Sequence, residues 1–386
     1  MTEWIECTLD KLGEIVGGAT PSTKCEDYYG GSIPWITPKD LSSFKGRYIT
    51  SGERNITEKG LASCSAQMMP KDAVLFTSRA PIGYVAIASQ SVCTNQGFKS
   101  IVVNEKADPL FVYYLLKYNK DAIEAMGSGT TFKEVSGKTM RAVKVRIPLD
   151  VSYQKRIAAV LDSLDTKIEN NERINDNLQQ QAAALFSSLY DRSNTEVRFT
   201  DLIQILGGGT PKTGENTYWN GNIAFFTPKD VGTPYTLITE KTITEEGLSH
   251  CNSRLYPVNT VFVTARGTVG KVGMSGVPMA MNQSCYALVG KETHQLLVYF
   301  YTLKAVDRLK HKASGAVFDA ITTRDFESEQ IMKLSDDDAT AFLRVAESMF
   351  QEVLNNNIEN LRLSTLRDSL LPKLMSGEID VSAVQL

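Results

Sequence analysis

Cysteine and histidine are both scarce in this chain of 386 residues, and their scarcity excludes several kinds of site. The six cysteines form no C-x-x-C pair, so the sequence predicts neither a zinc site nor a disulfide framework. The three histidines have no metal-ligand spacing, and no H-E-x-x-H motif occurs. We therefore expect no bound metal.

Long apolar runs are also missing. None approaches the roughly 20 residues of a membrane-spanning helix. The first residues include two acids and no basic stretch, so they do not resemble a secretory signal. These absences predict a cytoplasmic protein that does not contact a membrane.

The charge of the chain is close to balanced, at −3, but it is unevenly distributed. Residues 1–150 carry 18 Lys and Arg against 16 Asp and Glu, and residues 197–335 carry 14 against 12. The segments that follow them, 151–196 and 336–386, are acidic, with 5 against 7 and 4 against 9. This pattern permits a nucleic-acid partner for the two basic segments without requiring one.

An internal repeat is the main feature that the chain does have. Residues 17–41 align without a gap on residues 207–231, and 12 of these 25 positions are identical. The shared residues include Gly-Gly-x-Thr-Pro-x-Thr and, further on, Thr-Pro-Lys-Asp at 37–40 and 227–230. The similarity continues at slightly smaller offsets to residues 128–132 and 314–318. A repeat of this length indicates two copies of one domain and not the short units of a solenoid.

Each copy has the sequence pattern of an α+β domain. Short β-branched and aromatic runs at 73–77, 84–88 and 98–103 predict strands, and their second-copy counterparts have the same pattern. One helix is expected in each copy, at about 109–126 and 294–312. We therefore divide the chain into similar domains at 1–150 and 197–335, with helical regions at 151–196 and 336–386.

The helical regions carry matching apolar stripes, and each stripe contains two asparagines at equivalent positions. An antiparallel pair related by a pseudo-two-fold axis would place Asn171 opposite Asn360 and Asn175 opposite Asn356; alternatively, all four lie at the edge of the stripe. A helix of about 38 residues would be about 57 Å long and could act as a coiled-coil spacer. Pro372 is expected to end or kink the second helix, with Gly377 just beyond.

Motifs for catalysis are absent. The sequence contains no Walker motif and no G-x-S-x-G nucleophile elbow. The repeated Lys-Asp pairs, Lys39-Asp40 and Lys229-Asp230, have no second carboxylate at a fixed distance, so a catalytic role is disfavoured. The pattern is typical of a binding protein.

Taken together, the motifs resemble one known family. The repeated T-P-K-D, the T-S-R-A-P-I-G-Y-V run at 77–85, N-Q-G at 95–97, Q-K-R-I-A at 154–158 and the L-R-D-S-L-L-P-K-L tail at 366–374 occur in one order. This order is similar to that of the specificity (S) subunit of type I restriction–modification systems, over almost the whole chain. The resemblance implies two target-recognition domains that alternate with two helical regions.

The resemblance also implies a function. Each recognition domain is expected to read one half of a bipartite double-stranded DNA sequence, and the helices to set the spacer between the halves. The helices are further expected to dock two methyltransferase (M) subunits, to which two restriction (R) subunits can add. It implies that the S subunit itself is not an enzyme and holds no cofactor. The outward helix residues Gln154, Lys155, Arg156, Arg362 and Arg367 are the candidate M-subunit surface, unless they form an ordinary solvated face.

The two copies depart from each other within the shared motifs, because Ala265-Arg266-Gly267-Thr268 replaces Ser78-Arg79-Ala80-Pro81 and Ser284 replaces Gly97. Two unlike recognition domains predict an asymmetric target.

Two other functions remain open: a scaffold that binds proteins through duplicated domains, and a fragment of a fused restriction–methylation enzyme. Methyltransferase motifs would favour the second, but the repeats leave no room for them.

Candidate DNA-contacting residues follow from the side-chain chemistry of the shared motifs. Lys39 and Lys229 can contact phosphates or can pair with the neighbouring aspartates. Arg79 and Arg266 can read guanine, but a structural ion pair or a phosphate contact is favoured because both copies share them. The amides of Asn95, Gln96, Asn282 and Gln283 can read adenine, although backbone capping is favoured. The preferred candidates are two small polar loops with nearby lysines: Ser128, Gly129, Thr130, Thr131 and Lys133 in the first copy, and Ser314, Gly315, Lys310 and Lys312 in the second.

Overall fold

The computed structural model describes residues 3–79, 81–129, 133–232, 234–312 and 320–385. Contacts divide the chain into two compact units, Met1–Glu169 with Arg362–Leu386, and Asn170–Leu361. Each unit therefore contains one copy of the repeat together with part of each long helix. Within the described residues, no helix is long and apolar enough to cross a membrane.

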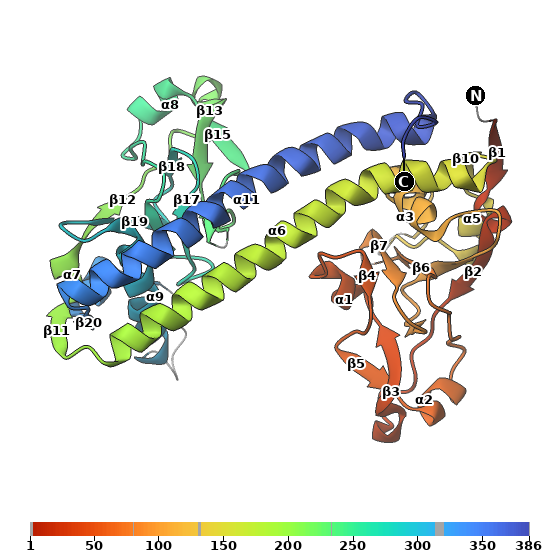
Figure 1. Cartoon of the computed structure of the whole chain (residues 1–386), viewed down its shortest axis with the longest axis horizontal. Helices are drawn as coiled ribbons and strands as arrows, with labels where there is room; N and C mark the ends of the chain where they lie inside the picture. Colours follow the sequence, from red (N-terminus) through yellow and green to blue (C-terminus); the bar gives the residue numbers. More distant parts are fainter. Residues whose placement is uncertain (1–2, 80, 130–132, 233, 313–319, 386) are drawn as a thin grey trace. The chain divides into compact units, whose positions relative to one another are not determined.

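The first unit is built on a mixed five-stranded sheet with the strand order β2-β9-β6-β7-β4, beside a three-stranded sheet, β5-β3-β8, and a two-stranded pair, β1-β10 (Figure 1). Its strands are β1 (Trp4–Thr8), β2 (Gly13–Gly17), β3 (Tyr29–Ile36), β4 (Tyr48–Ile49), β5 (Arg54–Ile56), β6 (Val74–Ser78), β7 (Ile82–Ala88), β8 (Cys93–Thr94), β9 (Lys99–Val103) and β10 (Lys144–Pro148). Its short helices are α1 (Pro38–Ser42), α2 (Glu58–Ala62), α3 (Pro109–Tyr118), α4 (Lys120–Ala125) and α5 (Gly137–Ala142).

The second unit repeats these three sheets in the same order: β12-β19-β16-β17-β14, β15-β13-β18 and β11-β20. Its strands are β11 (Thr195–Arg198), β12 (Ile203–Gly207), β13 (Trp219–Phe226), β14 (Tyr235–Thr236), β15 (Lys241–Ile243), β16 (Val261–Thr264), β17 (Val272–Ser275), β18 (Met279–Met281), β19 (Cys285–Gly290) and β20 (Gln330–Lys333). Its short helices are α7 (Phe199–Leu202), α8 (Glu245–Ser249), α9 (Gln295–Lys312) and α10 (Thr323–Ser328). The α+β class and the duplication are both confirmed.

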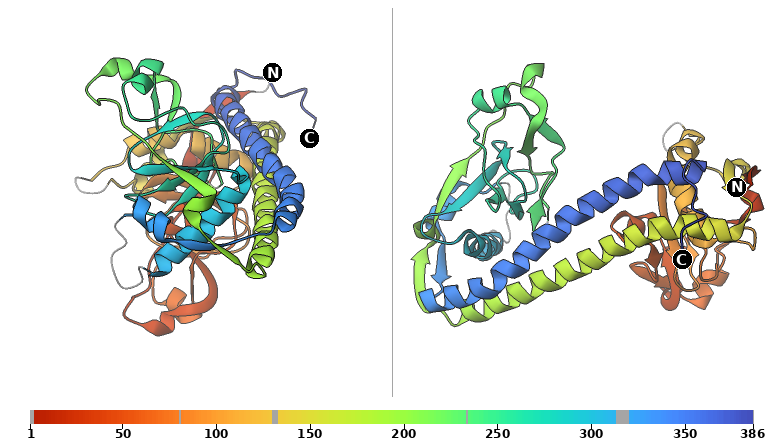
Figure 2. Two further views of the ribbon diagram at one scale, coloured as in Figure 1. Left: turned by 90° about the vertical axis from the view of Figure 1, so that its left-hand side faces the viewer. Right: turned by 45° about the horizontal axis from the view of Figure 1, so that its top comes forward.

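Each unit buries one face of its large sheet against a helix of its own copy and part of the long helices. In the first unit, Phe76 of β6 and Phe111 of α3 are fully buried in one cluster with Leu161. In the second, Phe300 of α9 stacks on Phe186 with ring centroids 5.0 Å apart. Figure 2 shows α9 beneath the sheet of its unit. The apolar stripes of the long helices are therefore shared between the helix pair and the domain cores.

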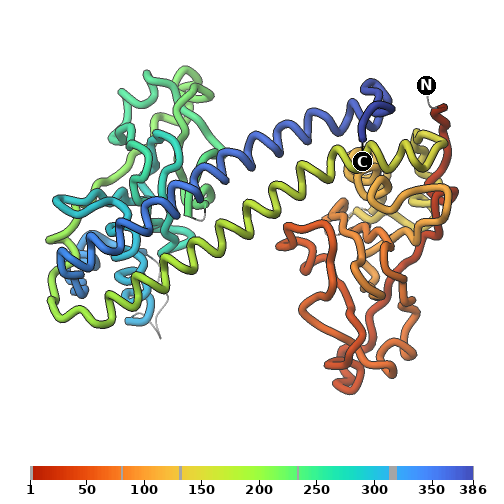
Figure 3. Tube along the Cα trace, in the orientation of Figure 1, coloured from red at the N-terminus to blue at the C-terminus, as the bar shows by residue number. Residues whose placement is uncertain are grey.

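The two long helices are α6 (Val151–Asp191) and α11 (Asp336–Ser376), each of 41 residues, and Figure 3 follows each as one uninterrupted trace. Asn171 donates a hydrogen bond to Asn360 at 2.8 Å, and Asn356 donates one to Asn175 at 2.9 Å. These are the two pairs that the antiparallel register predicts. Asn171, Asn175 and Asn356 are buried, so they do not lie at the edge of the stripe.

One predicted helix is divided, and one helix end differs from expectation. The helix predicted at 109–126 is two helices, because Asn119 breaks the pattern and its side chain donates to the carbonyl of Leu115 at 2.8 Å. Pro372 does not end α11, which continues to Ser376. The end falls at Gly377, whose φ of +78° is a left-handed conformation that suits glycine.

Candidate nucleic-acid interface

The Thr-Pro-Lys-Asp motif forms a braced turn in the first copy. Pro38 occupies the first turn of α1, and the carboxylate of Asp40 accepts from the backbone N–H of Thr37 at 2.7 Å and from its hydroxyl at 2.6 Å. The same carboxylate also accepts from the N–H of Glu53 at 2.8 Å. Charge-assisted hydrogen bonds of this kind are stronger than neutral ones. Asp40 therefore joins the turn to the next loop.

The second copy has the same brace. Asp230 accepts from the N–H of Thr227 at 2.8 Å, from its hydroxyl at 2.6 Å and from the N–H of Glu240 at 2.7 Å. The turn is thus a common framework feature of the two domains, although the intervening loops differ in length. The repeated aspartate is explained by structure alone.

The repeated lysines form ion pairs with glutamates and not with these aspartates. Lys39 contacts Glu53 at 2.7 Å and Lys229 contacts Glu240 at 3.5 Å, and both lysine side chains are about four-fifths exposed, at 79% and 80%. The alternative in which each lysine pairs with its neighbouring aspartate is wrong. The hydrogen bond and charge of Glu53 raise the pKa of Lys39, and those of Lys39 lower the pKa of Glu53. Both lysines can exchange these exposed partners for a phosphate.

The Asn-Gln turns have the same internal bonds in both copies. Asn95 accepts from the N–H of Gly97 at 2.8 Å, and Asn282 accepts from the N–H of Ser284 at 3.0 Å. The hydroxyls of Thr20 and Thr210, in the Gly-Gly-x-Thr segments, donate to Gln96 and Gln283. The asparagines cap the backbone, as the sequence analysis favours, and the glutamines remain exposed.

The two shared arginines have different surroundings. Arg79 lies 3.7 Å from Glu134, whose other oxygen lies 3.6 Å from Lys99. Arg79 and Glu134 are also joined as a β-bridge, and the equivalent bridge in the second copy joins Arg266 to Ala320. Among the described residues, no carboxylate forms an ion pair with the exposed Arg266. Within the part of the chain that the structure describes, an ion pair therefore ties this shared position only in the first copy.

Backbone hydrogen bonds connect these turns within each domain, and Asn95 and Asn282 donate to the carbonyls of Ile36 and Phe226, which directly precede the Thr-Pro-Lys-Asp turns. In the first copy, the carbonyl of Gly97 accepts from the N–H of Ser78 at 2.7 Å, and the carbonyl of Ser78 accepts from the N–H of Val135 at 3.0 Å. The N–H of Ser128 donates to the carbonyl of Glu134, and the N–H of Glu134 donates to the carbonyl of Ser128. In the second, Ala265 donates to Ser284 at 2.8 Å and accepts from Ile321 at 2.9 Å. We call these two connected sets of turns loop surface 1 and loop surface 2.

The remaining candidates are distributed unevenly. Gly129 and Lys133 are exposed beside Ser128, whereas Thr130, Thr131, Ser314 and Gly315 lie outside the described residues. Lys310 lies against Gly270, where a Cβ atom would meet its side chain at 2.5 Å. Lys312 pairs with Glu329, whose side chain is fully buried, so it has a structural partner.

Two members of the candidate helix surface are not outward-facing. Gln154 is fully buried; it accepts from Asp108 at 2.9 Å and donates to the carbonyl of Pro148 at 2.9 Å. Arg367 is mostly buried and contacts Asp165 at 2.7 Å. Lys155 and Arg362 are exposed and Arg156 is half-buried, so these three remain on the accessible face.

One functional-looking arginine could not be found from the sequence. Arg47 is 5% exposed, and its guanidinium contacts the side chains of Asp162, Thr166 and Glu169 on α6. It lies in no repeated motif, and its partners are more than 100 positions away along the chain.

Within the described residues, no cluster of His, Cys, Asp and Glu side chains could hold a metal ion.

Comparison with known proteins agrees with this organisation. A family model described as the type I restriction modification DNA specificity domain matches residues 1–180 and 192–333. A type I restriction enzyme specificity subunit (MjaIX) of Methanocaldococcus jannaschii is 30% identical over 98% of this chain and 94% of its own length. The HindI specificity subunit of Haemophilus influenzae is 24% identical over 73% of this chain and 80% of its own length.

A solved structure is similar along the whole chain. The S subunit of a type I restriction–modification system from M. genitalium matches with a TM-score of 0.64 and 16% identity, over 97% of this chain and 96% of its own. At this identity the likeness concerns the fold. The matched family model and the full-length relative establish that the chain belongs to the family of DNA specificity subunits of type I restriction–modification systems.

Proposed function

We propose that this chain gives a type I restriction–modification enzyme its DNA sequence specificity, with each recognition domain reading one half of a bipartite, asymmetric target. The duplication carries this proposal. Two domains with one framework present loop surfaces built from the same turns but with different residues between them. Because shared residues cannot distinguish two sequences, the differing residues are assigned to base recognition and the shared ones to framework and phosphate contacts.

The exposed cations of the loop surfaces supply the affinity for DNA. Lys39, Lys229 and Arg266 can each neutralise a phosphate and release counterions, and Lys133 adds a further charge beside Ser128. Residues 1–150 and 197–335 are assigned as the recognition domains, and 151–196 and 336–386 as the helical regions. The helices are assigned to spacing the half-sites and to docking two methyltransferase subunits, with two restriction subunits completing the nuclease in the cytoplasm.

Methylation mapping tests this function. The chain is co-expressed with the methyltransferase subunit encoded beside it, and modified adenines are mapped on single DNA molecules. The expected result is a two-part motif with one modified adenine in each half and a fixed unspecified spacer. A continuous motif, or none from a purified and intact complex, would contradict the proposal.

A domain exchange supplies the matched control. Replacing residues 1–150 with the corresponding domain of another family member should change one half of the motif and leave the other half and the spacer length unchanged. The reciprocal exchange of residues 197–335 should change only the other half. A change in both halves from one exchange would contradict the assignment of one half-site to each domain.

A further inference from the structure

In the first unit, Arg47 directly precedes β4 and binds to helix α6. We call this place, where the residue before the edge strand meets the long helix, the seam. Besides the side-chain contacts of Arg47 with Asp162, Thr166 and Glu169, its guanidinium donates to the backbone carbonyl of Asp162 at 3.0 Å. The Thr166 contact measures 2.9 Å and the nearest Glu169 contact 3.0 Å. Burial would lower the pKa of Arg47, but hydrogen bonding to Glu169 and the charge of Asp162 raise it overall. The seam of the first copy is therefore a filled guanidinium site.

Strand pairing shows which residue replaces this arginine in the second copy. Ile87 donates its N–H to the carbonyl of Arg47 at 2.7 Å, and its counterpart Met274 donates to the carbonyl of Pro234 at 2.7 Å. The adjacent strands pair in the same parallel register, with Tyr48 opposite Ile87 and Tyr235 opposite Met274. Pro234 therefore occupies the position of Arg47 and has no side chain that can reach the helix.

The helix side of the seam keeps part of its polar chemistry. The offset of 185 between equivalent asparagines of the two helices places Glu347 at the position of Asp162 and Gln351 at that of Thr166. Leu354 replaces Glu169. One carboxylate and one hydrogen-bonding side chain thus remain, although the arginine that used them in the first copy is missing.

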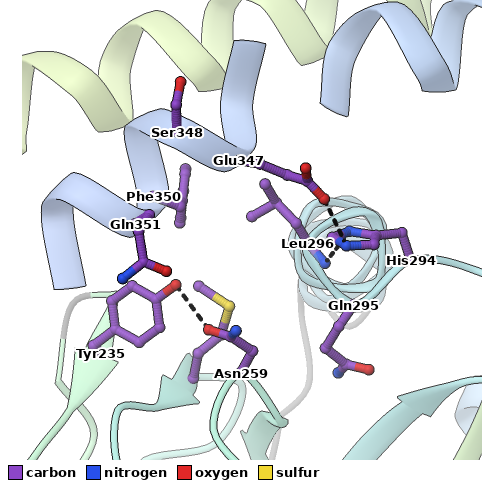
Figure 4. A pocket seen from close by; sticks show the side chains of 10 residues that line it. Tyr235, Asn259, His294, Gln295, Leu296, Glu347, Ser348, Phe350 and Gln351 are labelled. Atoms are coloured by element: carbon purple, nitrogen blue, oxygen red, sulfur yellow. Dashed lines mark hydrogen bonds and ion pairs between the residues drawn. The ribbon is translucent and has the colours of Figure 1, made fainter. Parts of the chain in front are cut away.

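A pocket lies at this place in the second unit, with a volume of about 380 Å³ (Figure 4). Tyr235 lines it from β14 and Asn259 from the turn before β16, and Glu347, Phe350 and Gln351 line it from α11. The ring of Tyr235 meets that of Phe350 edge to face, with centroids 6.4 Å apart. The pocket therefore combines aromatic walls with one carboxylate, the imidazole of His294 and three amide side chains, those of Asn259, Gln295 and Gln351.

The carboxylate of Glu347 has one partner within the chain. It lies 2.8 Å from Nε2 of His294, and Nδ1 of the same ring accepts from the N–H of Leu296 at 3.3 Å. An imidazole whose Nδ1 accepts can donate from Nε2. The side chain of Glu347 is half exposed, so the carboxylate remains accessible to a ligand.

We propose that this pocket binds the guanidinium group of an arginine side chain presented by the methyltransferase subunit. A guanidinium is flat and permanently charged, bonds a carboxylate through two N–H groups, and stacks on aromatic rings. The first copy holds the same group at the equivalent place. The choice of partner rests on the proposed function, which assigns methyltransferase docking to the helix that forms one wall of the pocket.

Three variants test this inference. Pro234→Arg supplies the arginine of the first copy within the chain and should fill the pocket. Glu347→Gln removes the charge while keeping the shape. Glu352→Gln, on an exposed position of the same helix outside the pocket, is the matched control. Each full-length chain is tested for affinity toward the purified methyltransferase subunit, and for ethylguanidinium contacts by saturation-transfer NMR.

The expected result is a loss of methyltransferase affinity of about tenfold for Glu347→Gln, as for a partly exposed charge pair, and a larger loss for Pro234→Arg. Both variants should also lose the ethylguanidinium signal, and the control should retain both properties. If Pro234→Arg does not fold, as judged by its thermal transition, Gln351→Leu takes its place.

Unchanged methyltransferase affinity in both pocket variants would overturn the inference, including when ethylguanidinium binds, because the arginine would then come from elsewhere. Failure of the unmodified chain to bind the methyltransferase would instead overturn the proposed function. The two failures are therefore distinguishable.

Discussion

At the scale of single residues, Glu134 makes the two shared arginines unequal. It lies beside both Arg79 and Lys99. In the second copy, Ala320 occupies the position of Glu134, and Tyr286 occupies that of Lys99. A phosphate must compete with Glu134 for Arg79, but not with any described carboxylate for Arg266. Arg266 is therefore expected to contribute more to DNA affinity.

Exchanging the partner residues between copies tests this difference. Arg266→Ala should weaken DNA binding by the assembled complex several-fold and reduce its salt dependence by about one phosphate contact. Ala320→Glu should have a similar effect, and Arg79→Ala a smaller one. Glu134→Ala should strengthen binding. Fluorescence anisotropy over a salt series measures all four, and equal losses for the two arginine variants would contradict the prediction.

The candidate site was predictable from the sequence only in part, and the reason lies in side-chain direction. The repeat identifies Lys39-Asp40 as one motif, but not that Asp40 turns inward to three backbone and hydroxyl donors while Lys39 turns out to Glu53. Gln154 shares this difficulty, because an amide at the start of a helix can be solvated or can cap buried backbone groups. Such choices depend on partners that are distant in the sequence.

At the scale of secondary-structure elements, periodicity predicts more. For an antiparallel pair, the apolar stripe with its asparagines predicts which residues face each other, because a buried amide needs a polar partner at a defined position. Arg47 could not be placed in the same way, since a single basic residue in a loop has no periodicity. Pro372 does not end the helix, because a helix tolerates the loss of one backbone hydrogen bond near its end, but Gly377 lies just beyond the last helical residue, as expected.

The asparagine pairs should specify register at some cost in stability. Asn175→Leu leaves the buried amide of Asn356 without this partner and is expected to destabilise the second unit by about 1–3 kcal/mol. The double variant with Asn356→Leu should recover much of this loss, because two apolar side chains can pack together. Denaturant unfolding of the parent chain, the two single variants Asn175→Leu and Asn356→Leu, and the double variant measures the coupling. Additive losses would indicate that the pair does not act as a unit.

The filled seam of the first unit should depend strongly on Arg47. Arg47→Ala leaves Asp162 and Glu169 facing each other without a cation, and a loss of about 3–5 kcal/mol is expected. Burial already raises the pKa of Asp162, which the charge of Arg47 opposes. Without Arg47 that pKa should rise further above its unfolded value, so the deficit should shrink as the pH falls through it. A deficit independent of pH would contradict this account.

At the scale of the whole molecule, the duplication includes the helices as well as the recognition domains. Both long helices have 41 residues, and their asparagines recur at the same offset as the rest of the stripe. An ancestral unit of one domain and one helix would form the same contacts between two copies. Length changes are therefore tolerable only when they occur in both helices at positions that face each other, because a change in one helix displaces every later pair.

A paired insertion tests the assignment of the helices to spacing. Seven residues inserted into α6 between Asn171 and Asn175, and seven inserted into the facing place in α11 between Asn356 and Asn360, preserve the apolar stripe and lengthen each helix by about 10.5 Å. Since DNA rises about 3.4 Å per base pair, the unspecified spacer of the methylated motif should grow by about three base pairs. The two half-sites should stay the same, because the loop surfaces are untouched.

Methylation mapping of the paired variant measures the spacer length and the half-sites. An insertion in α6 alone, which breaks the asparagine register, should abolish the motif. An unchanged spacer in the paired variant would show that something other than helix length sets the distance between the half-sites.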